Sequence, residues 1–353
     1  MRYSKQIKLE GFGTEAQDKL AKAKVLVIGA GGLGCPAITY LASAGIGTIG
    51  IIDNDQVEES NLPRQPLYSS NDIGKSKVAI ASEKAKQLNP DAKILTWQTK
   101  ITSDNAMEII KEFDMVLDCT DNYEARYLIN DACVILDKPW IYGAVEAWEG
   151  QLATFNLPLT DGTKTPTYRC IFPEPDIEAL SCNDVGVIGT MPGTIGILQA
   201  NEAIKAITGV GKISNGLLLI NLQSNCFQTI KIPRNEEAIS KIKSLKTDYS
   251  GFENIDPEQI TFQQIQSDRH KYFIIDIREE YELDEKPFPI ADAHIPVGDL
   301  IQNGFDFDSD ISYVLVCTSG ARSLQTAKKL KEMNPGIDIM SLTGGVQNKS
   351  API

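Results

Sequence analysis

Two hydrophobic patterns alternate along the first part of the chain. Short runs of continuously apolar residues lie at 24–29, 47–52, 93–98, 114–118 and 139–142. Between them, segments in which apolar residues recur every three or four positions lie at 33–44, 74–88, 104–112 and 123–136. Because a buried strand is apolar throughout and an amphipathic helix repeats every 3.6 residues, the alternation predicts strands and helices in turn. This order is typical of a largely parallel sheet with helices on both faces.

The pattern changes after these runs. Residues 150–156 and 217–232 alternate between polar and apolar side chains, which predicts antiparallel strands. Helical patterns cover Gly193–Thr208 and, ahead of the first strand, residues 5–22. We therefore expect an α/β domain whose sheet has a parallel part and an antiparallel part.

A second, smaller domain is expected further along the chain. Residues 234–258 are charged and weakly periodic, a composition typical of a linker. A new apolar strand at 272–277 follows this segment. The length of 353 residues suits two domains better than one.

The charge and the cysteines narrow the class of protein. The net charge is −13 and no basic tract offsets it, which argues against nucleic-acid binding. No apolar run is long enough to span a bilayer, and the first residues lack the apolar core of a signal peptide. The seven cysteines are scattered and odd in number, as in proteins whose thiols stay reduced. We expect a cytoplasmic protein that does not bind membranes.

A glycine-rich turn follows the first predicted strand. It reads Gly29-Ala30-Gly31-Gly32-Leu33-Gly34, the G-x-G-x-x-G pattern of nucleotide sites. Glycines let backbone N–H groups approach phosphate oxygens, and the N-terminus of the next helix adds partial positive charge. Asp53 ends the next strand, where a dinucleotide-binding protein keeps its ribose-binding acid. These residues alone fit NAD as well as ATP, and Asp53 fits a simple turn or cap acid nearly as well.

Several charged residues downstream favour a site that cleaves a triphosphate. Arg64, Lys75 and Lys77 supply positive charge in an acidic chain, although a single surface lysine has no such meaning. The strand at 114–118 ends in a carboxylate-rich loop, where Asp121 has the oxygen ligands that Mg²⁺ prefers. A cap for the next helix is the alternative role for Asp121 and Asn122.

Together these motifs resemble the ThiF/MoeB/HesA family of adenylating enzymes. The resemblance covers roughly residues 1–235 and rests on Gly29–Gly34, Asp53–Asp55, Asn61–Gln65, Lys77 and Asp118–Asn122. It implies a Rossmann-like adenylating domain with a mixed sheet, a homodimer, and ATP with Mg²⁺ as cofactors. It also implies a partner, a small ubiquitin-like sulfur carrier ending in Gly-Gly. The carrier's C-terminal carboxylate would attack the α-phosphate of ATP, release pyrophosphate and form an acyl-adenylate.

The resemblance assigns roles to individual residues. Arg64 and Lys77 would stabilise the phosphates, Asp53 would contact the ribose, and Asp121 would hold Mg²⁺. The whole set expected to contact the nucleotide is Gly29, Gly31, Gly32, Gly34, Asp53, Asp55, Asn61, Arg64, Lys77, Asp121 and Asn122. The family also uses an arginine near the N-terminus toward the partner subunit's nucleotide. Lys5 stands in its place, and lysine keeps the charge without the bidentate fork.

Two further cysteine positions follow from the same resemblance. Many members hold a structural zinc with two C-x-x-C pairs, but here Cys170 is the one cysteine present of those four. One thiolate does not make a closed tetrahedral site, so we expect no structural zinc. Cys182 falls in a segment expected to form a loop near the adenylate. Its thiol would accept the activated carboxyl or a mixed disulfide, or it is a small buried apolar residue.

A second candidate site lies at 317–322, which reads Cys-Thr-Ser-Gly-Ala-Arg. The apolar strand before it delivers Cys317 into a short loop, and a helix is expected from about Ser323. Loop N–H groups and Arg322 would form an anion-binding nest that favours the thiolate. The alternative is a core cysteine at a strand end. The four residues between Cys317 and Arg322 fit sulfur transfer, since the comparable phosphatase loop is one residue longer.

This loop belongs to a second resemblance, to a single-domain rhodanese, over about residues 258–353. The matching motifs are Asp276–Glu279, His294–Pro296 and Gly344–Gly345. The resemblance implies that Cys317 carries a persulfide and Arg322 stabilises its anion. Asp276, Arg278 and His294 are expected to brace the domain.

The two resemblances together predict three segments: an adenylating domain at 1–235, a linker at 236–257 and a small α/β rhodanese domain at 258–353. The expected product is a thiocarboxylate on the carrier, used for molybdopterin, thiamine or a related sulfur compound, with a cysteine desulfurase or another persulfide donor as sulfur source. Three alternatives remain: adenylation of a small-molecule or tRNA-base carboxylate, an NAD-dependent oxidoreductase, and a non-enzymatic persulfide-binding module.

Overall fold

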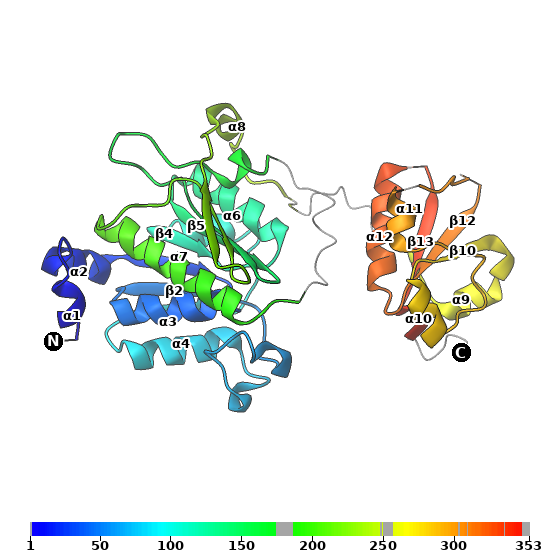
Figure 1. Ribbon diagram of the computed structural model, residues 1–353, viewed down its shortest axis with the longest axis horizontal. Helices are drawn as coiled ribbons and strands as arrows, with labels where there is room; N and C mark the ends of the chain where they lie inside the picture. Colours follow the sequence, from blue (N-terminus) through cyan, green and yellow to red (C-terminus); the bar gives the residue numbers. More distant parts are fainter. Residues whose placement is uncertain are drawn as a thin grey trace. The chain divides into compact units, whose positions relative to one another are not determined.

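The protein forms two compact units, Met1–Gly251 and Phe252–Ile353 (Figure 1). The computed structural model describes residues 2–173, 186–247, 249, 257–302, 304–308, 310–334 and 336–347. Each unit has its own sheet and its own apolar clusters. Within the described residues, no helix has both the length and the apolar character that a membrane crossing requires.

The described part of the first unit contains an eight-stranded mixed sheet in the order β3-β2-β1-β4-β5-β6-β7-β8. The parallel part consists of β1 (Lys24–Ile28), β2 (Thr48–Ile52), β3 (Lys93–Trp97), β4 (Met115–Asp118) and β5 (Trp140–Glu146). The antiparallel part consists of β6 (Glu149–Phe155), β7 (Leu217–Asn221) and β8 (Cys226–Ile230). The mixed α/β fold expected from the sequence is confirmed.

The strand order reverses at β1, which pairs with β2 on one side and β4 on the other. In open α/β sheets, a crevice for ligands forms at the carboxyl ends of the strands at such a reversal. The loops after β1, β2 and β4 are the three that carry the glycine turn, Asp53 and Asp121. The topology therefore gathers three motifs that are far apart in the sequence.

Helices cover both faces of this sheet. Alternate residues of β1 point to opposite faces, so Val25 and Val27 belong to one apolar cluster and Leu26 and Ile28 to the other. Helices on the first face, three of them side by side in Figure 1, are α2 (Gly13–Lys22), α3 (Gly34–Ala44), α4 (Lys77–Leu88) and α7 (Thr190–Thr208). Helices on the second face are α5 (Ala106–Ile110) and α6 (Tyr123–Ile135).

The single helix expected at 5–22 is wrong, because the structure has two. The first is α1 (Ser4–Ile7), and α2 begins only at Gly13. Gly11 and Gly13 have φ of +76° and +63°, values in the left-handed region that a continuing right-handed helix does not use. The amphipathic spacing continues across this turn, which is why the sequence pattern did not reveal the break.

Part of the segment expected as a linker packs on the first unit. It contains a short helix, α8 (Glu236–Ser240), with Ile239 buried. Further along, the hydroxyl of Tyr249 donates to Asp131 Oδ2 at 3.0 Å, and the ring lies in the apolar cluster around α6. Asp131 also receives two hydrogen bonds from Arg169, at 2.7 and 2.9 Å. Hence the start of the expected linker at 236–257 belongs to the fold of the first unit.

The second unit has a parallel sheet in the order β11-β10-β12-β13-β9. Its strands are β9 (Gln259–Ile260), β10 (Tyr272–Asp276), β11 (Ala293–His294), β12 (Ser312–Val316) and β13 (Asp338–Leu342). Its described helices are α9 (Phe262–Ser267), α10 (Glu280–Glu285), α11 (Val297–Gln302) and α12 (Ala321–Met333). The central strand, β12, leads directly into the loop that begins with Cys317.

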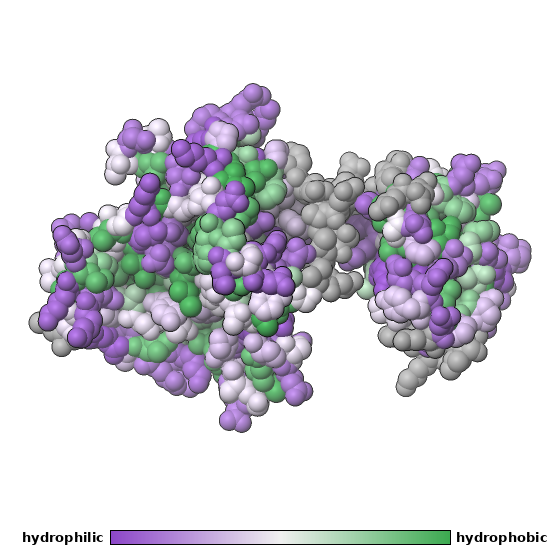
Figure 2. Space-filling view, viewed as in Figure 1, coloured by the Kyte–Doolittle hydropathy of each residue, from purple (hydrophilic) through white to green (hydrophobic). Residues whose placement is uncertain are grey.

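Hydrophilic residues dominate the outer edges of both units on the face shown in Figure 2, with apolar residues in smaller groups between them. This distribution fits the charged composition, because acidic and basic side chains remain hydrated at the surface.

We predict that Tyr249→Phe destabilises the first unit and not the second. The change removes a hydrogen bond to a buried carboxylate, which costs about 1–3 kcal/mol. Calorimetry of the full chain should show a lower midpoint for the transition of the first unit. Tyr281→Phe is the matched control, because Tyr281 is 65% exposed and lies in the second unit. An unchanged midpoint in Tyr249→Phe would contradict the anchoring of this segment.

Candidate active sites

The glycine turn after β1 packs tightly against the loop after β4. Gly29 has φ +95°, and a Cβ placed on it would lie 2.5 Å from the carbonyl oxygen of Cys119. A Cβ on Gly34 would lie 2.0 Å from the carbonyl oxygen of Gly29. By contrast, Gly31 has room for a side chain, with Gln65 Nε2 as its nearest neighbour at 3.6 Å from such a Cβ. Gly29 and Gly34 therefore shape the turn, while Gly31 leaves its backbone open to a ligand.

The carboxylate of Asp53 joins this turn to the end of β2. Its Oδ2 accepts a hydrogen bond from the Ala30 N–H at 2.7 Å, and its Oδ1 accepts one from the Asp55 N–H at 2.8 Å. The turn-acid role that the sequence left open is thus present in the structure. Each carboxylate oxygen can accept more than one hydrogen bond, so these contacts leave room for a ribose hydroxyl.

Lys77 begins α4 and points its ammonium group at the same loop. Its Nζ lies 2.9 Å from Asp55 Oδ2, and the lysine side chain is 6% exposed against 55% for the aspartate. Among the described residues, this exposed carboxylate is the ion-pair partner of the buried ammonium group. Asp55 therefore holds Lys77 in position at the site.

Arg64 comes from the loop that lies beside the glycine turn. A Cβ on Gly32 would lie 3.4 Å from the Arg64 carbonyl oxygen, and the Arg64 guanidinium donates to the Ser60 carbonyl at 2.7 Å. Asn61 is buried, and its Oδ1 accepts from the Glu58 N–H at 3.2 Å. Asn61 thus shapes the loop that presents Arg64.

Gln65 was not among the site residues that the sequence predicted. Its side chain is buried against Gly31, and among the described residues its Oε1 has no hydrogen-bond partner. An unpartnered buried oxygen is costly, which makes a bound ligand a natural partner. The signal was present in the sequence, because Gln65 ends the Asn61–Gln65 motif.

The end of β4 and the loop after it carry one buried and one exposed carboxylate. Asp118 is fully buried, and its Oδ1 accepts from the Thr120 N–H and hydroxyl at 2.9 and 2.7 Å. Burial raises the pKa of Asp118 to about 6. Asp121 is exposed, so its oxygens are available to a cation. Asn122 caps α6, because its Oδ1 accepts from the Ala125 N–H at 2.9 Å.

Lys5 lies far from the glycine turn of its own chain. It is exposed on α1, where the side chain of its neighbour Gln6 donates to the Ala44 carbonyl at 2.8 Å. Ala44 is the last residue of α3, whereas the glycine turn ends at the first residue of that helix, Gly34. The helix spans 11 residues, which at 1.5 Å each is about 16 Å. Lys5 therefore belongs to the opposite end of α3 from the site.

Cys170 joins the segment around Thr167 to the segment around Asn235, where the family resemblance would place the two C-x-x-C pairs. Its sulfur accepts from the Thr167 N–H at 3.4 Å and from the Asn235 N–H at 3.3 Å. Among the described residues, no group of three or more His, Cys, Asp or Glu side chains is arranged to hold a metal ion. The absence of zinc stays a prediction. Cys182 lies outside the described residues, so its role also stays a prediction.

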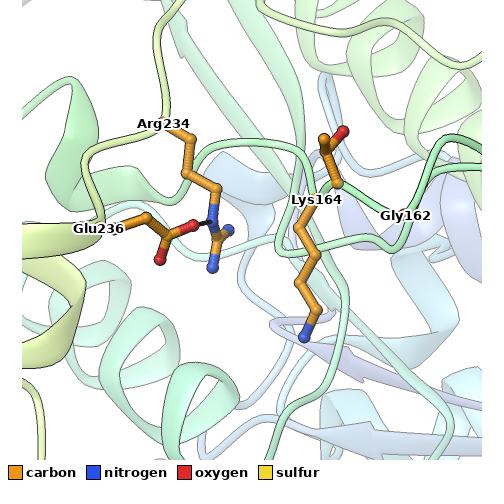
Figure 3. A pocket seen from close by; sticks show the side chains of 5 residues that line it. Gly162, Lys164, Arg234 and Glu236 are labelled. Carbon is orange, nitrogen blue, oxygen red and sulfur yellow. Dashed lines mark hydrogen bonds and ion pairs between the residues drawn. The ribbon is translucent and has the colours of Figure 1, made fainter.

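A surface pocket of about 590 Å³ lies beside Asn235, the residue that contacts Cys170. It is lined by Gly162, Thr163, Lys164, Arg234 and Glu236. In Figure 3, Arg234 and Lys164 approach it from separate segments. Arg234 pairs with Glu236 at 2.7 Å and donates to the Thr165 carbonyl at 2.6 Å, and Lys164 pairs with Asp137. Arg234 thus joins the segment at 234–236 to the chain around Thr165.

In the second unit, Cys317 lies in a nest of backbone donors. Its sulfur is buried and accepts from the N–H groups of Gly320 and Ser323, each at 3.2 Å. A Cβ on Gly345 would lie 2.2 Å from the Cys317 carbonyl oxygen, and that oxygen accepts from the Val346 N–H at 3.0 Å. The segment after β13 thus closes over the loop. Such donors stabilise a thiolate or a persulfide anion.

Arg322 is paired with a carboxylate that the sequence analysis did not single out. Its guanidinium donates to Glu282 Oε2 at 2.7 Å and to Oε1 at 3.4 Å, and the Thr318 hydroxyl also donates to Oε1. Burial acts to raise the pKa of Glu282, but these hydrogen bonds outweigh it and lower the pKa to about 2. Glu282 follows the Asp276–Glu279 motif by three residues, yet only the fold shows that it reaches the loop.

Three polar residues that the sequence singled out in this unit, Asp276, Arg278 and His294, make contacts between its elements. Asp276 and Arg278 form a buried ion pair at 2.6 Å, and Arg278 also donates to the Lys286 carbonyl at 2.9 Å. His294 Nε2 lies 2.7 Å from the Arg278 carbonyl oxygen. These contacts join β10 and β11 to the chain around α10, which carries Glu282.

Comparison with known proteins places this chain in a family. The sequence profile of the ThiF family matches residues 3–241, so the chain belongs to the ThiF family. A sulfur carrier protein adenylyltransferase of Thermus thermophilus is 41% identical over 66% of this chain and 88% of its own length. The probable molybdopterin-synthase adenylyltransferase of Porphyra purpurea is 36% identical over 98% of this chain and 92% of its own.

Relatives with two activities match nearly the whole chain. The adenylyltransferase and sulfurtransferase MOCS3 of Drosophila grimshawi is 37% identical over 98% of this chain and 82% of its own length. The crystal structure of E. coli MccB with ATP has a TM-score of 0.59 and 24% identity over 67% of this chain and 72% of its own, a likeness of fold. The chain is an adenylyltransferase that uses ATP, with a sulfurtransferase domain. This excludes the NAD-dependent oxidoreductase and the non-enzymatic module.

We predict that the buried carboxylate of Asp118 makes stability depend on pH. Its folded pKa of about 6 exceeds the unfolded value of about 3.9. The contribution of Asp118 to the free energy of unfolding is therefore fully present below pH 4, and it is lost as the pH rises through 6. Asp118→Asn does not titrate, so its free energy of unfolding relative to the wild type should rise between pH 4 and 7, by up to about 3 kcal/mol. Urea unfolding at several pH values measures this difference, and a constant difference would refute the assignment.

Proposed function

We propose that the first unit adenylates the C-terminal carboxylate of a small ubiquitin-like sulfur carrier ending in Gly-Gly, and that the second unit delivers sulfur to form a thiocarboxylate. The observation that carries this proposal is that one chain contains two candidate sites, one suited to adenylation and one suited to sulfur transfer. A cluster of cations and carboxylates lies where β1, β2 and β4 end, and a nest of N–H donors surrounds Cys317. Relatives named for a sulfur carrier support the choice of acceptor.

In the adenylation step, a carboxylate oxygen attacks the α-phosphorus of ATP and pyrophosphate leaves. Negative charge grows on the transferred group and on the leaving group, so fixed cations lower the barrier. Arg64 and Lys77 would supply them, with Lys77 exchanging Asp55 for a phosphate oxygen. Asp53 would hold the ribose. Asp121 would hold Mg²⁺, which supplies additional positive charge at the phosphates.

In the sulfur step, a persulfide on Cys317 attacks the carbonyl carbon of the acyl-adenylate, and AMP leaves. The product is an acyl disulfide between the carrier and Cys317. A second thiolate must then attack the Cys317 sulfur, so that the thiocarboxylate leaves with the electron pair. We propose Cys182 as that thiol. The resulting disulfide returns to thiols by an external dithiol reductant.

The sulfur itself would come from a cysteine desulfurase or another persulfide donor in the cytoplasm. The thiocarboxylate would serve molybdopterin, thiamine or related biosynthesis, and the molybdopterin-synthase name of one relative supports the first. Adenylation of a small-molecule or tRNA-base carboxylate is the second candidate. The paired sulfurtransferase domain favours the carrier, because tethering raises the local concentration of the second step.

We also propose a homodimer in which Lys5 of one subunit acts at the nucleotide site of the other. The support is that Lys5 lies at the end of α3 opposite the glycine turn of its own chain. A second copy related by a two-fold axis would bring such a residue to the site.

We predict that Lys77→Ala lowers ATP–pyrophosphate exchange at least a hundredfold and leaves persulfide formation on Cys317 intact, because a transition-state cation contributes about 3 kcal/mol. Cys317→Ala should do the reverse. A panel of small carriers ending in Gly-Gly, with ATP and Mg²⁺, supplies the assay.

Lys75→Ala is the matched control for Lys77→Ala. Lys75 is two residues away, is more exposed and pairs with Asp72 rather than with Asp55. Exchange should be retained in this variant. Absence of exchange in the wild type with every carrier would remove the proposed substrate class, and loss of both activities in either variant would contradict two separable sites.

A mixing experiment tests the action of Lys5 in trans. Lys5→Ala and Lys77→Ala homodimers should each be weak in pyrophosphate exchange. Random mixing should restore about a quarter of wild-type activity, because half of the dimers are mixed and each has one intact site. Mixtures no more active than their parents would mean that Lys5 does not act across the dimer.

A further inference from the structure

Glu282 compensates the positive charge of Arg322 in the loop that begins with Cys317. Arg322 is the one cation in the 317–322 sequence, and Glu282 accepts two hydrogen bonds from its guanidinium and one from the Thr318 hydroxyl. The Glu282 side chain is 13% exposed, and that of Arg322 is 32% exposed. The Glu282 carboxylate therefore packs against the loop in an ion pair with Arg322. Of the two partners, the carboxylate is the more buried.

Neutral pH does not release this pair. The hydrogen bonds from Arg322, Thr318 and the Glu279 N–H keep Glu282 ionised, because they outweigh the effect of burial. Two further acids of α10, Glu280 and Asp284, are exposed. The surroundings of the buried thiol thus combine local N–H donors with a cation that is compensated by Glu282.

We propose that Glu282 is a specificity-determining residue for the sulfur donor: by occupying Arg322, it disfavours free inorganic thiosulfate and leaves persulfides as the preferred donors. This inference rests on the proposed sulfur transfer at Cys317. An unpaired arginine beside a thiolate would attract a small dianion, whereas a paired one presents a carboxylate that repels it. A persulfide carries at most one negative charge at its reacting end, so it meets less repulsion.

The two donors react by the same bond changes. With thiosulfate, the Cys317 thiolate attacks the outer sulfur, the sulfur–sulfur bond breaks, and sulfite leaves with the electron pair. With a persulfide, the thiolate attacks the terminal sulfur and the donor's thiolate leaves with the electron pair. Both leave a persulfide on Cys317. Glu282 therefore discriminates by the charge of the donor and not by a different chemical step.

The experiment compares both donors with the full chain and with Glu282→Gln. Mass spectrometry of the Cys317 peptide follows the initial rate at which the cysteine gains one sulfur atom from thiosulfate or from cysteine persulfide. In Glu282→Gln, the ratio of kcat/KM for thiosulfate to that for cysteine persulfide should rise at least about tenfold, which corresponds to about 1.4 kcal/mol. The change should lie mainly in a lower KM for thiosulfate.

Glu280→Gln is the matched control, because it makes the same change of net charge at an exposed position of α10. Its donor ratio should stay at the wild-type value. Glu282→Ala is a second variant that frees Arg322 without an amide, and it should show the same rise if the glutamine variant does not fold.

The outcomes separate this inference from the proposed function. An unchanged ratio in the Glu282 variants, or an equal rise in Glu280→Gln, overturns the role of Glu282 while leaving sulfur transfer intact. A wild-type protein whose Cys317 accepts sulfur from neither donor overturns the sulfurtransferase role of that cysteine, and the inference falls with it.

Discussion

The carboxylate of Asp53 connects the two turns that form the proposed nucleotide site. One oxygen holds the Ala30 N–H inside the glycine turn, and the other holds the Asp55 N–H after β2. Because Asp55 in turn binds the ammonium group of Lys77, two short hydrogen bonds and one ion pair link three segments. The fold allows this, since β1 and β2 are neighbours in the sheet and end at the same edge.

Both sites keep a key cation paired with a carboxylate. Lys77 pairs with Asp55 in the first unit, and Arg322 pairs with Glu282 in the second. The two pairs differ in which partner is exposed. Asp55 is the exposed member of the first pair, whereas Glu282 is the more buried member of the second. The first pair therefore suits an exchange with substrate, and the second suits a permanent adjustment of charge.

Much of the architecture followed from local patterns. The strands at the centre of the first sheet, the glycine turn and the loop after Cys317 each have a strong local signal, because burial and backbone conformation restrict the residue types there. The turn at Gly11 and Gly13 did not, since its flanks share one amphipathic pattern. The attachment of Tyr249 to Asp131 was also not predictable, because it joins residues 118 positions apart through one hydroxyl group.

The sequence by itself determined the family, and it predicted the two-domain order and the reactive groups, from Lys77 and Asp121 to Cys317. These depend on residue type and spacing, which the chain carries without folding. Tertiary structure decided what each group faces: Asp53 holds a turn, Asn122 caps a helix, Lys5 lies at the far end of α3, and Glu282 neutralises Arg322. The physical reason is that charge pairing and burial depend on distances between segments, and those distances exist only once the sheets have formed.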